Sequence, residues 1–544
     1  MNATRARSLA SIALLVAMAM TMTGCTRGTV GGSRDVLVIA QQWEPMSLNP
    51  ALENGTSATE WGLLLFSYLV KYDDRGRLVT DVATEIPSLR NGGISADGLT
   101  ITYHLHGGIR FADGRPLTAQ DCVWSIDAIN NPRNNVQSRF GYDAVESARA
   151  PNATTLVLRL KHPFAPLISV VLAPQGFPIL PRHLLERYPD INHVAFNALP
   201  VGSGPYVVSR WYHGDRVVLQ ANPQYWRGRP AISSLVIRFV ADPQTAINLL
   251  QTHEADGYFN EQSYADYPIL QGLTGYRVTS TPQNAVGAII FNTRDPVTAD
   301  PRVRMALAEA IDIKTVVAKT YRGALRSGGA GRGLFLWAYD PRSYPDIPYD
   351  PGGARRLLDE SGWKLGNDGV RHKDGRSLTA SFILQAQTPG DVTIGDNVAQ
   401  YERAVGVRVL LKQFNITQFV APSTLGGPVY GGKFQMALYP FENGDDPDTT
   451  DQFACSNVPP NGYNKSRFCD PQADVLLRAG VRTYDRAKRK ALYSKLEALL
   501  YRKLPIALLY QTRQVNTFTQ RLHGQSTSLS GAFWNVGAWR LSPR

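Results

Sequence analysis

The stretch SADGLTITYHLHGGIRFADGRPLTAQDCVWSIDAI, residues 95–129, joins a strand pattern directly to a helix pattern. Its first half alternates with a period of two, so that Ile101 and Tyr103 fall on one face and polar residues on the other. Its second half contains Thr118 and Asp121, whose spacing is typical of a capping box and predicts a helix start. A strand followed soon afterwards by a capped helix favours an α/β or α+β fold.

The alternation of strands and helices continues on both sides of this stretch. Asp-Pro pairs at 242–243, 300–301 and 350–351 predict helix starts, because aspartate caps a first turn in which proline needs no hydrogen bond. A long helix is predicted from Asp485 to just before Pro505. Further strands are predicted at DVLVIAQ (35–41), TLVLRL (155–160), RVVLQ (216–220), LVIRFV (235–240), VRVLL (407–411) and IALLY (506–510).

The length and composition are those of a globular protein with more than one lobe. The chain has 544 residues, of which 43% are hydrophobic and 19% are charged. Single cores divide beyond roughly 250–300 residues, so we expect at least two lobes. The formal net charge of +12 comes from scattered arginines rather than from a basic stripe, which argues against a nucleic-acid partner.

The N-terminus has the features of an export signal. Two arginines precede an apolar run that is too short to span a bilayer and that leads to Gly24-Cys25. This ending resembles a bacterial lipoprotein signal, although Met22 stands where leucine is usual. The resemblance implies that residues 1–24 are removed and that acylated Cys25 anchors the protein in the lipid bilayer. An ordinary signal peptide is the alternative, and both place the mature protein outside the cytoplasm.

The four cysteines divide into distinct roles. Cys455 and Cys469 lie 14 residues apart in a loop rich in Asn, Pro and Gly, and this spacing predicts a disulfide in an oxidising compartment. In the chain-entropy treatment, closing a loop of this size adds on the order of 3 kcal/mol to the free energy of unfolding. Cys122 has no partner and lies in a predicted apolar helix, so we expect a buried and unreactive thiol.

Motifs of common hydrolases and metal enzymes are absent from the sequence. There is no G-x-S-x-G elbow, and His253-Glu254 is not followed by a second histidine at zincin spacing. The densest acidic cluster, residues 442–451, lacks the spacing of a calcium loop. We therefore expect no catalytic residue, no metal and no cofactor. The acidic cluster is either a solvated loop or a site for a cationic ligand group.

Several segments in colinear order resemble the extracytoplasmic solute-binding proteins of the peptide/nickel ABC-importer family, especially its dipeptide- and oligopeptide-binding branch. Residues 95–129 are similar to the central signature of that family. The loop at 442–469 resembles the dipeptide-binding branch, in which two cysteines at similar spacing form a disulfide. The similarity covers about residues 35–515 and is also carried by GSGPYVVSRWYHGDRVVLQANPQYW (202–226), FNTRDPVTADPRVRMALAEAID (291–312), YDPGGARRLLDESGW (349–363) and DRAKRKALYSKLEALLYRKLPIALLYQ (485–511).

This resemblance implies a two-lobed periplasmic-binding-protein-like fold with a hinge and an extra subdomain inserted in lobe I. It also implies a monomer that captures a peptide between its lobes and delivers it to the permease subunits of an ABC importer. The implied units are a lipidated tether at 25–33, lobe I at 34–75 with 200–285 and 506–544, the inserted subdomain at 76–199, and lobe II at 286–505.

The resemblance also implies a set of ligand-binding residues. A binder that accepts many peptides holds their shared amine, amides and carboxylate. In dipeptide binders an aspartate just upstream of Gly-Asp-Pro meets the amine, and the corresponding region here reads FENGDDP (441–447), with one residue added. Glu442 is the first candidate for that role and Asp445 the second. The other expected contacts are Asp446, the aromatic walls Phe441 and Tyr439, and backbone from Asn54-Gly55-Thr56 and from Asn284 and Ala285 through Ala288.

One departure from the family pattern bears on the ligand. The segment that carries the carboxylate-clamping arginine in dipeptide binders reads SFILQAQTPGDVTIGDN (381–397) here and contains no arginine. A buried unpaired carboxylate is costly, so a longer peptide or a ligand without a carboxylate fits better. A nickel chelate, haem, an opine or an oligosaccharide are alternatives on the same fold. An extracytoplasmic hydrolase or peptide chaperone is the alternative of another class.

Overall fold

The structure is a computed structural model that describes residues 36–53, 55–136, 138–174, 176–260, 264–386, 388–528 and 531–543. The predicted signal segment 1–24, Cys25 and Asn54 lie outside the described residues. Gly55 and Thr56 belong to the first turn of α2 (Gly55–Leu65).

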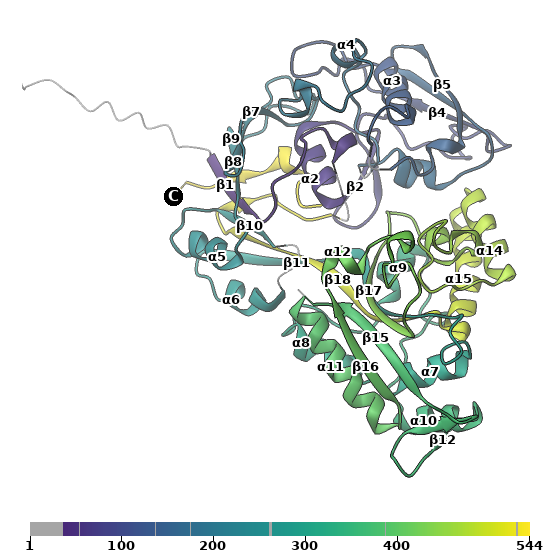
Figure 1. The fold of residues 1–544 in the computed structure, drawn as a ribbon. Coiled ribbons are helices and arrows are strands. Elements are labelled where there is room, and N and C mark those ends of the chain that lie inside the picture. The colour runs from purple at the N-terminus through teal and green to yellow at the C-terminus, as the bar shows by residue number, and fades with distance from the viewer. Residues whose placement is uncertain are drawn as a thin grey trace, which may run out of the picture.

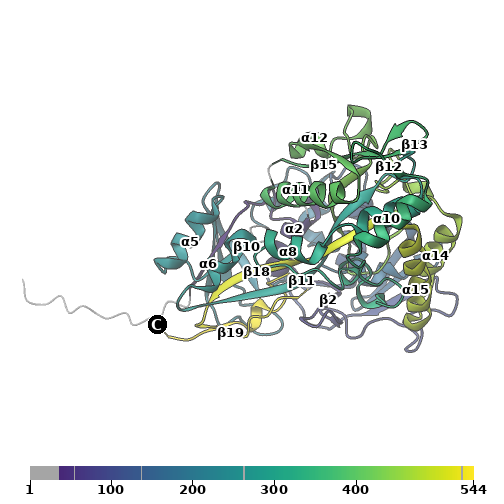
Figure 2. The same ribbon diagram turned by 90° about the horizontal axis from the view of Figure 1, so that it is seen from below.

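One ten-stranded sheet runs through both lobes of the molecule (Figures 1 and 2). Its strand order is β16-β15-β17-β11-β18-β10-β1-β9-β8-β7. The mixed sheet, with helices on its faces, confirms the predicted α/β class and the two lobes. In chain order its strands are β1 (Val36–Gln41), β7 (Tyr206–Tyr212), β8 (Arg216–Ala221), β9 (Ser234–Phe239), β10 (Gly257–Asn260), β11 (Tyr276–Phe291), β15 (Thr379–Gln385), β16 (Arg408–Phe414), β17 (Met436–Glu442) and β18 (Ile506–Thr519).

Two long antiparallel strands, β11 and β18, connect the lobes. On the first-lobe side, β18 also pairs with β10, and on the second-lobe side β11 also pairs with β17. Between these two regions the register of β11 and β18 shifts, from Pro282 to Val286. Irregularities of this kind bend a strand pair locally. The shift therefore marks the place in the fold where a hinge is expected.

Helices and a C-terminal segment cover the first lobe's part of the sheet. On one face, α2 and the C-terminal segment share a core that buries Trp61 and Phe533. On the other face, α5 (Pro243–Gln251) and α6 (Tyr267–Gln271) share a core with Ala40 of β1. Both faces of this half-sheet are thus buried, as expected for its parallel β1, β9 and β10 strands.

A separate layer with its own core lies between β1 and β7 in the sequence. Its three-stranded sheet, ordered β4-β6-β5, packs with α3 around Ile101 and Tyr103, which lie on one face of the strand as predicted and are fully buried. Val481 and Tyr484 of the second lobe pack against the same core. The elements are β2 (Val70–Tyr72), β3 (Leu78–Thr80), β4 (Thr100–His104), α3 (Ala119–Asn130), β5 (Val145–Asn152), β6 (Thr155–Leu160) and α4 (Arg182–Leu185).

The second lobe's part of the sheet also carries helices on both faces (Figure 1). The first face is covered by α7 (Pro301–Glu309), α8 (Ile313–Thr320), α10 (Pro351–Glu360) and α11 (Pro389–Ala404). The opposite face is covered by α9 (Gly331–Phe335), α12 (Ile416–Phe419), α13 (Thr450–Phe453), α14 (Pro471–Arg482) and α15 (Arg486–Lys503). Small peripheral strands of this lobe are β12 (Lys364–Leu365), β13 (Arg371–Lys373) and β14 (Arg376–Ser377). The C-terminal segment of the first lobe adds β19 (Leu522–His523) and β20 (Arg540–Leu541).

The predicted helix starts are confirmed by their caps. The side chains of Asp242, Asp300 and Asp350 accept the backbone N–H groups of Thr245, Arg302 and Gly353 at 2.8, 2.9 and 2.8 Å. Asp485 accepts from Lys488 at 2.9 Å, and Thr118 and Asp121 form the predicted capping box. Within the described ranges, no helix has both the length and the apolar character needed to cross a bilayer.

Candidate functional site between the lobes

The carboxyl ends of β15, β16 and β17 meet at one edge of the second lobe. β15 pairs in parallel with both of the other strands, so the three chains leave the sheet in the same direction. The last residue of β17, Glu442, pairs with Ala285 near the hinge, so this edge faces the first lobe. In open α/β sheets, ligands bind outside the carboxyl ends of the strands. The loop that follows β17 is therefore the place to look for a binding site.

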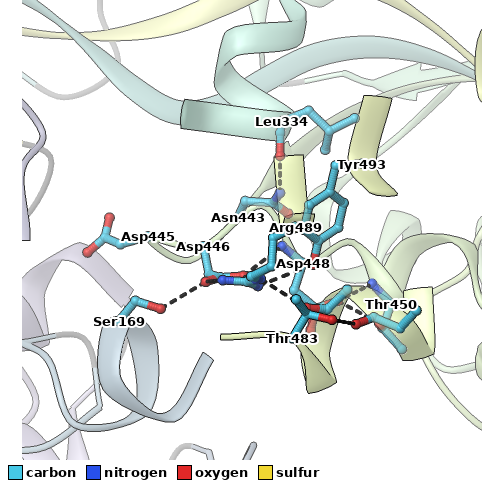
Figure 3. Close-up of polar contacts among 12 residues, drawn as sticks. Ser169, Leu334, Asn443, Asp445, Asp446, Asp448, Thr450, Thr483, Arg489 and Tyr493 are labelled. Carbon is cyan, nitrogen blue, oxygen red and sulfur yellow. Dashed lines mark hydrogen bonds and ion pairs between the residues drawn. The ribbon is translucent and has the colours of Figure 1, made fainter. Parts of the chain in front are cut away.

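Asp446 in this loop is held by Arg489 of α15 (Figure 3). Arg489 Nη1 donates to Asp446 Oδ2 at 2.8 Å and Nη2 donates to Oδ1 at 2.6 Å, and both side chains are buried. Ser169 Oγ donates to the same carboxylate at 2.8 Å, and the Asp448 N–H donates at 3.1 Å. Asp446, expected to contact ligand, thus directs its carboxylate to groups of the protein itself.

Asp445 differs sharply from its neighbour. Its side chain is only 2% exposed, and Figure 3 shows its carboxylate turned away from the Asp446–Arg489 pair. Asn284 Nδ2 donates to Oδ1 at 2.6 Å, whereas Oδ2 has no hydrogen-bond partner among the described residues. Burial raises the pKa of Asp445 to about 7, although the Asn284 hydrogen bond acts in the opposite direction. The site therefore contains a buried carboxyl with one unused oxygen.

The same loop is hydrogen-bonded to the inserted layer, which contains β2. Tyr72 Oη of β2 donates to the backbone carbonyl of Asp445 at 2.9 Å. Ser169, which bonds Asp446, also belongs to the inserted layer. A third contact joins Tyr484, whose Oη donates to the Gly98 carbonyl at 3.0 Å. The second lobe is therefore hydrogen-bonded to this layer at Asp445, at Asp446 and at Tyr484.

A cavity of about 290 Å³ opens between the inserted layer and this loop. Its second-lobe wall includes Glu442, whose side chain is exposed, and Asp448 and Asp451. Burial raises the pKa of Asp448 to about 6 and raises that of Asp451. The opposite wall is aromatic and apolar and includes Phe140 and Val171. The cavity therefore combines an acidic face with an apolar one.

The two predicted aromatic walls lie side by side on β17 and surround a lysine. Lys465 Nζ lies 4.3 Å from the ring centre of Tyr439 and 5.8 Å from that of Phe441. Tyr430 and Tyr463 complete the enclosure, at 5.3 and 5.4 Å. Burial lowers the pKa of Lys465 to about 8. Tyr439 and Phe441 therefore face a cation of the protein itself.

The segment from Asn284 to Ala288 forms part of β11 and is paired on both sides. The Asn284 carbonyl accepts a hydrogen bond from the Asn443 N–H at 2.7 Å, and the Ala285 carbonyl accepts one from Thr512 Oγ1 at 3.2 Å. From Ala285 to Ala288 the strand pairs with β17. These carbonyls thus accept hydrogen bonds from the protein itself, and the Asn284 side chain is bonded to Asp445 of the acidic loop.

The predicted disulfide between Cys455 and Cys469 is present, and Cys122 is a buried free thiol as expected. The disulfide closes the segment between the acidic loop and α14. Arg489, Ser169 and Tyr72 also belong to this site but carry no signal in the sequence, since each lies far along the chain from the loop that it contacts. No cluster of three or more potential metal-ligating side chains occurs in the part of the chain that the structure describes.

Sequence comparison assigns the chain to a family. The pattern described as "Bacterial extracellular solute-binding proteins, family 5 Middle" matches residues 77–465. The chain belongs to family 5 of the bacterial extracellular solute-binding proteins. This assignment confirms the resemblance noted in the sequence, and the family comprises substrate-binding components of ABC importers, peptide binders among them.

This chain is similar over most of its length to three named bacterial proteins. Protein XP55 of Streptomyces lividans is 30% identical over 97% of this chain and 94% of its own length. The oligopeptide-binding protein AppA of Bacillus subtilis is 25% identical over 93% of this chain and 91% of its own. The solved structure of AppA with a nonapeptide covers 93% of this chain and 99% of that one, with a TM-score of 0.72 and 22% identity. The structure of NikZ from Campylobacter jejuni in complex with Ni(L-His) matches 93% of this chain and 99% of its own, with a TM-score of 0.75 and 25% identity.

Proposed function

We propose that this protein captures peptides between its two lobes and delivers them to the permease of an ABC importer. Membership of family 5 and the similarity to an oligopeptide-binding protein support this function. The observation that carries the proposal is the unused oxygen of Asp445, buried at the junction of the lobes. A cationic amine supplies what this carboxyl lacks, because charge-assisted hydrogen bonds are about twice as strong as neutral ones.

Asp445 rather than Glu442 is the better anchor for the amine on this structure. The Glu442 side chain is exposed, so water screens its charge. Asp445 is buried, and Asn284 fixes one of its oxygens at 2.6 Å. A fixed, desolvated carboxyl interacts more strongly with an ammonium than a solvated one does. Glu442 then adds a second negative charge in the lining of the 290 Å³ cavity.

Asp446 and Arg489 take a supporting role in this proposal. Their two-pronged ion pair holds the loop on α15, and Ser169 extends it to the inserted layer. Asp445 is therefore carried by a loop whose next residue is fixed. Closure moves lobe I (34–75, 200–285, 506–544), with its inserted subdomain (76–199), against lobe II (286–505) about the register shift of β11 and β18.

The opposite end of the ligand is recognised differently from a dipeptide carboxylate. The segment 381–397 has no arginine, and it contains a carboxyl, Asp391, that is 8% exposed. Burial raises the pKa of Asp391 to about 7, so this segment offers no positive charge to a ligand carboxylate. A buried peptide carboxylate would have no counter-charge there, so we propose a peptide that extends beyond this segment. The same observation favours the second candidate function, capture of a solute that has no carboxylate.

We further propose that the protein works as a monomer on the outer side of the membrane. Residues 1–24 form the signal, and acylated Cys25 anchors the chain in the bilayer. Family 5 is extracellular, which agrees with this location.

Calorimetric titration tests the proposed function. Free-amine peptides of four to nine residues should bind, and N-acetylated versions of the same sequences should bind much more weakly. Equal affinities for the two sets would exclude amine recognition and favour the non-peptide solutes. Mass spectrometry of molecules released from purified protein then identifies the solute class.

A further inference from the structure

A second, larger cavity lies outside the space between the lobes. It measures about 610 Å³ and is formed by the end of α2 with β2 and β3, by residues 205–231, and by the C-terminal segment 534–540. Its described lining includes no residue of lobe II. Ligand sites in proteins typically measure about 300–1,000 Å³, so this volume suits a small organic molecule.

The inner wall of this cavity has an excess of positive charge. Asp81 is 4% exposed and lies 3.3 Å from Lys71 Nζ and 3.4 Å from Arg227 Nη2. Its second oxygen accepts the Tyr68 N–H at 3.0 Å. Two cations thus meet one buried carboxylate, and the Lys71 side chain is only 11% exposed. One positive charge at this wall remains unbalanced.

Two further arginines extend the positive charge to the mouth of the cavity. Arg229 and Arg540 line it, and both are exposed. Neither forms an ion pair with a carboxylate of the described chain, and Asp81 is the sole acidic residue among the lining residues described. An anion in this cavity would therefore meet cations on its inner wall and at its mouth, with one acid to oppose it.

The remaining wall is aromatic and apolar. Phe66 and Tyr68 are 2% and 0% exposed, and Tyr225 and Trp534 also line the cavity. Such surfaces bury planar or aliphatic groups. The cavity thus offers an apolar wall for the body of a ligand and cations for its charged group.

We propose that this cavity is a second ligand site, specific for a small organic anion that carries a carboxylate, phosphate or sulfonate on an aromatic or aliphatic body. The site is independent of the peptide proposal, since the two cavities share no lining residue.

The test uses 8-anilinonaphthalene-1-sulfonate as the probe and N-phenyl-1-naphthylamine as its uncharged counterpart. Both are titrated by fluorescence into the full chain carrying Cys25→Ala, which removes the acylation site. The sulfonate should bind at one saturable site, and Arg229→Ala/Arg540→Ala should weaken it about tenfold or more. Lys71→Met should also weaken it, because Asp81 and Arg227 then balance one another.

The matched control is Arg376→Ala/Arg408→Ala, which removes two exposed arginines of lobe II. This variant should leave sulfonate binding unchanged. Equal affinity for the two probes, or equal losses in the test and control variants, would overturn the proposal. Displacement of the sulfonate by a saturating peptide would also overturn it, because the probe would then lie between the lobes. Retention of the sulfonate by the peptide-loaded protein supports a separate site.

Discussion

Both terminal nitrogens of Arg489 donate hydrogen bonds to the carboxylate of Asp446, at 2.8 and 2.6 Å, and both side chains are buried. Removing one member of a buried pair leaves the other charge without compensation. We predict that Arg489→Ala lowers the free energy of unfolding by about 3–5 kcal/mol. Denaturant titration measures the loss. Lys488→Ala, an exposed position on the same helix, should change it by less than about 0.5 kcal/mol, and an equal effect of the two would contradict the assigned role.

Asp445→Asn should weaken binding of free-amine peptides by about 2–4 kcal/mol, or roughly 30- to 1,000-fold, because a desolvated ammonium loses its counter-charge. Glu442→Gln should cost less, since its side chain is solvated. Calorimetry with one peptide and its N-acetylated form provides the measurement. The affinity for the acetylated form should change little in either variant. A larger loss in Glu442→Gln than in Asp445→Asn would move the amine anchor to Glu442.

The stability of the ligand-free protein should depend on the ionisation of Asp445. Burial raises its folded pKa to about 7, above the ordinary value of 3.8. Between these pH values the folded protein holds a proton that the unfolded chain has released. The contribution of Asp445 to the free energy of unfolding therefore falls as pH rises from about 4 to 7, by at most about 1.4 kcal/mol per pH unit. Asp391 acts in the same direction.

Comparison with Asp445→Asn isolates this contribution. Unfolding curves at several pH values between 4 and 7 should show a shallower decline in the variant. Parallel declines in the two proteins would mean that Asp445 ionises normally in the fold.

Substitution of Cys25 by alanine should release the protein from membranes into the soluble extracytoplasmic fraction. Fractionation and immunoblotting compare the two forms, and the mass of the wild-type N-terminal peptide should include acyl chains. A soluble wild-type protein whose mature chain starts elsewhere would contradict lipid anchoring.

Alkylation of the unfolded, non-reduced mature protein should modify one thiol, that of Cys122. Cys455 and Cys469 should become reactive after reduction, because they form a disulfide in the structure. Their loop connects the acidic segment to α14, so Cys455→Ser/Cys469→Ser should lower the free energy of unfolding by about 2–4 kcal/mol. Modification of three thiols before reduction would contradict the bridge.

The sequence predicts local structure well where the pattern is local. The alternation at Ile101 and Tyr103 and the Asp-Pro caps are properties of neighbouring residues, and the structure confirms them. By contrast, the strand predicted at 506–510 continues to Thr519, and β11 was not predicted at all. These segments are rich in Thr, Gln and Asn and therefore lack the apolar pattern from which a strand is predicted.

The candidate site likewise combines a feature that is local in the sequence with features that depend on distant residues. The resemblance locates the acidic loop, but the sequence cannot separate Asp445 from Asp446. Their environments depend on Arg489 and Asn284, which come from distant elements. One aspartate is paired and its neighbour retains an unused oxygen, and this difference exists only once the chain has folded.

The position of β18 also has a consequence for how the chain is made. This strand comes from near the C-terminus, yet it lies between β11 and β10 and supplies the ladder that joins the two halves of the sheet. Until residues 506–519 are available, each half can pair only with itself. Contacts between residues so far apart in sequence form slowly. A chain still emerging from an export channel therefore cannot complete its sheet early, and the last strand to arrive sets the moment at which the molecule becomes a single folded unit.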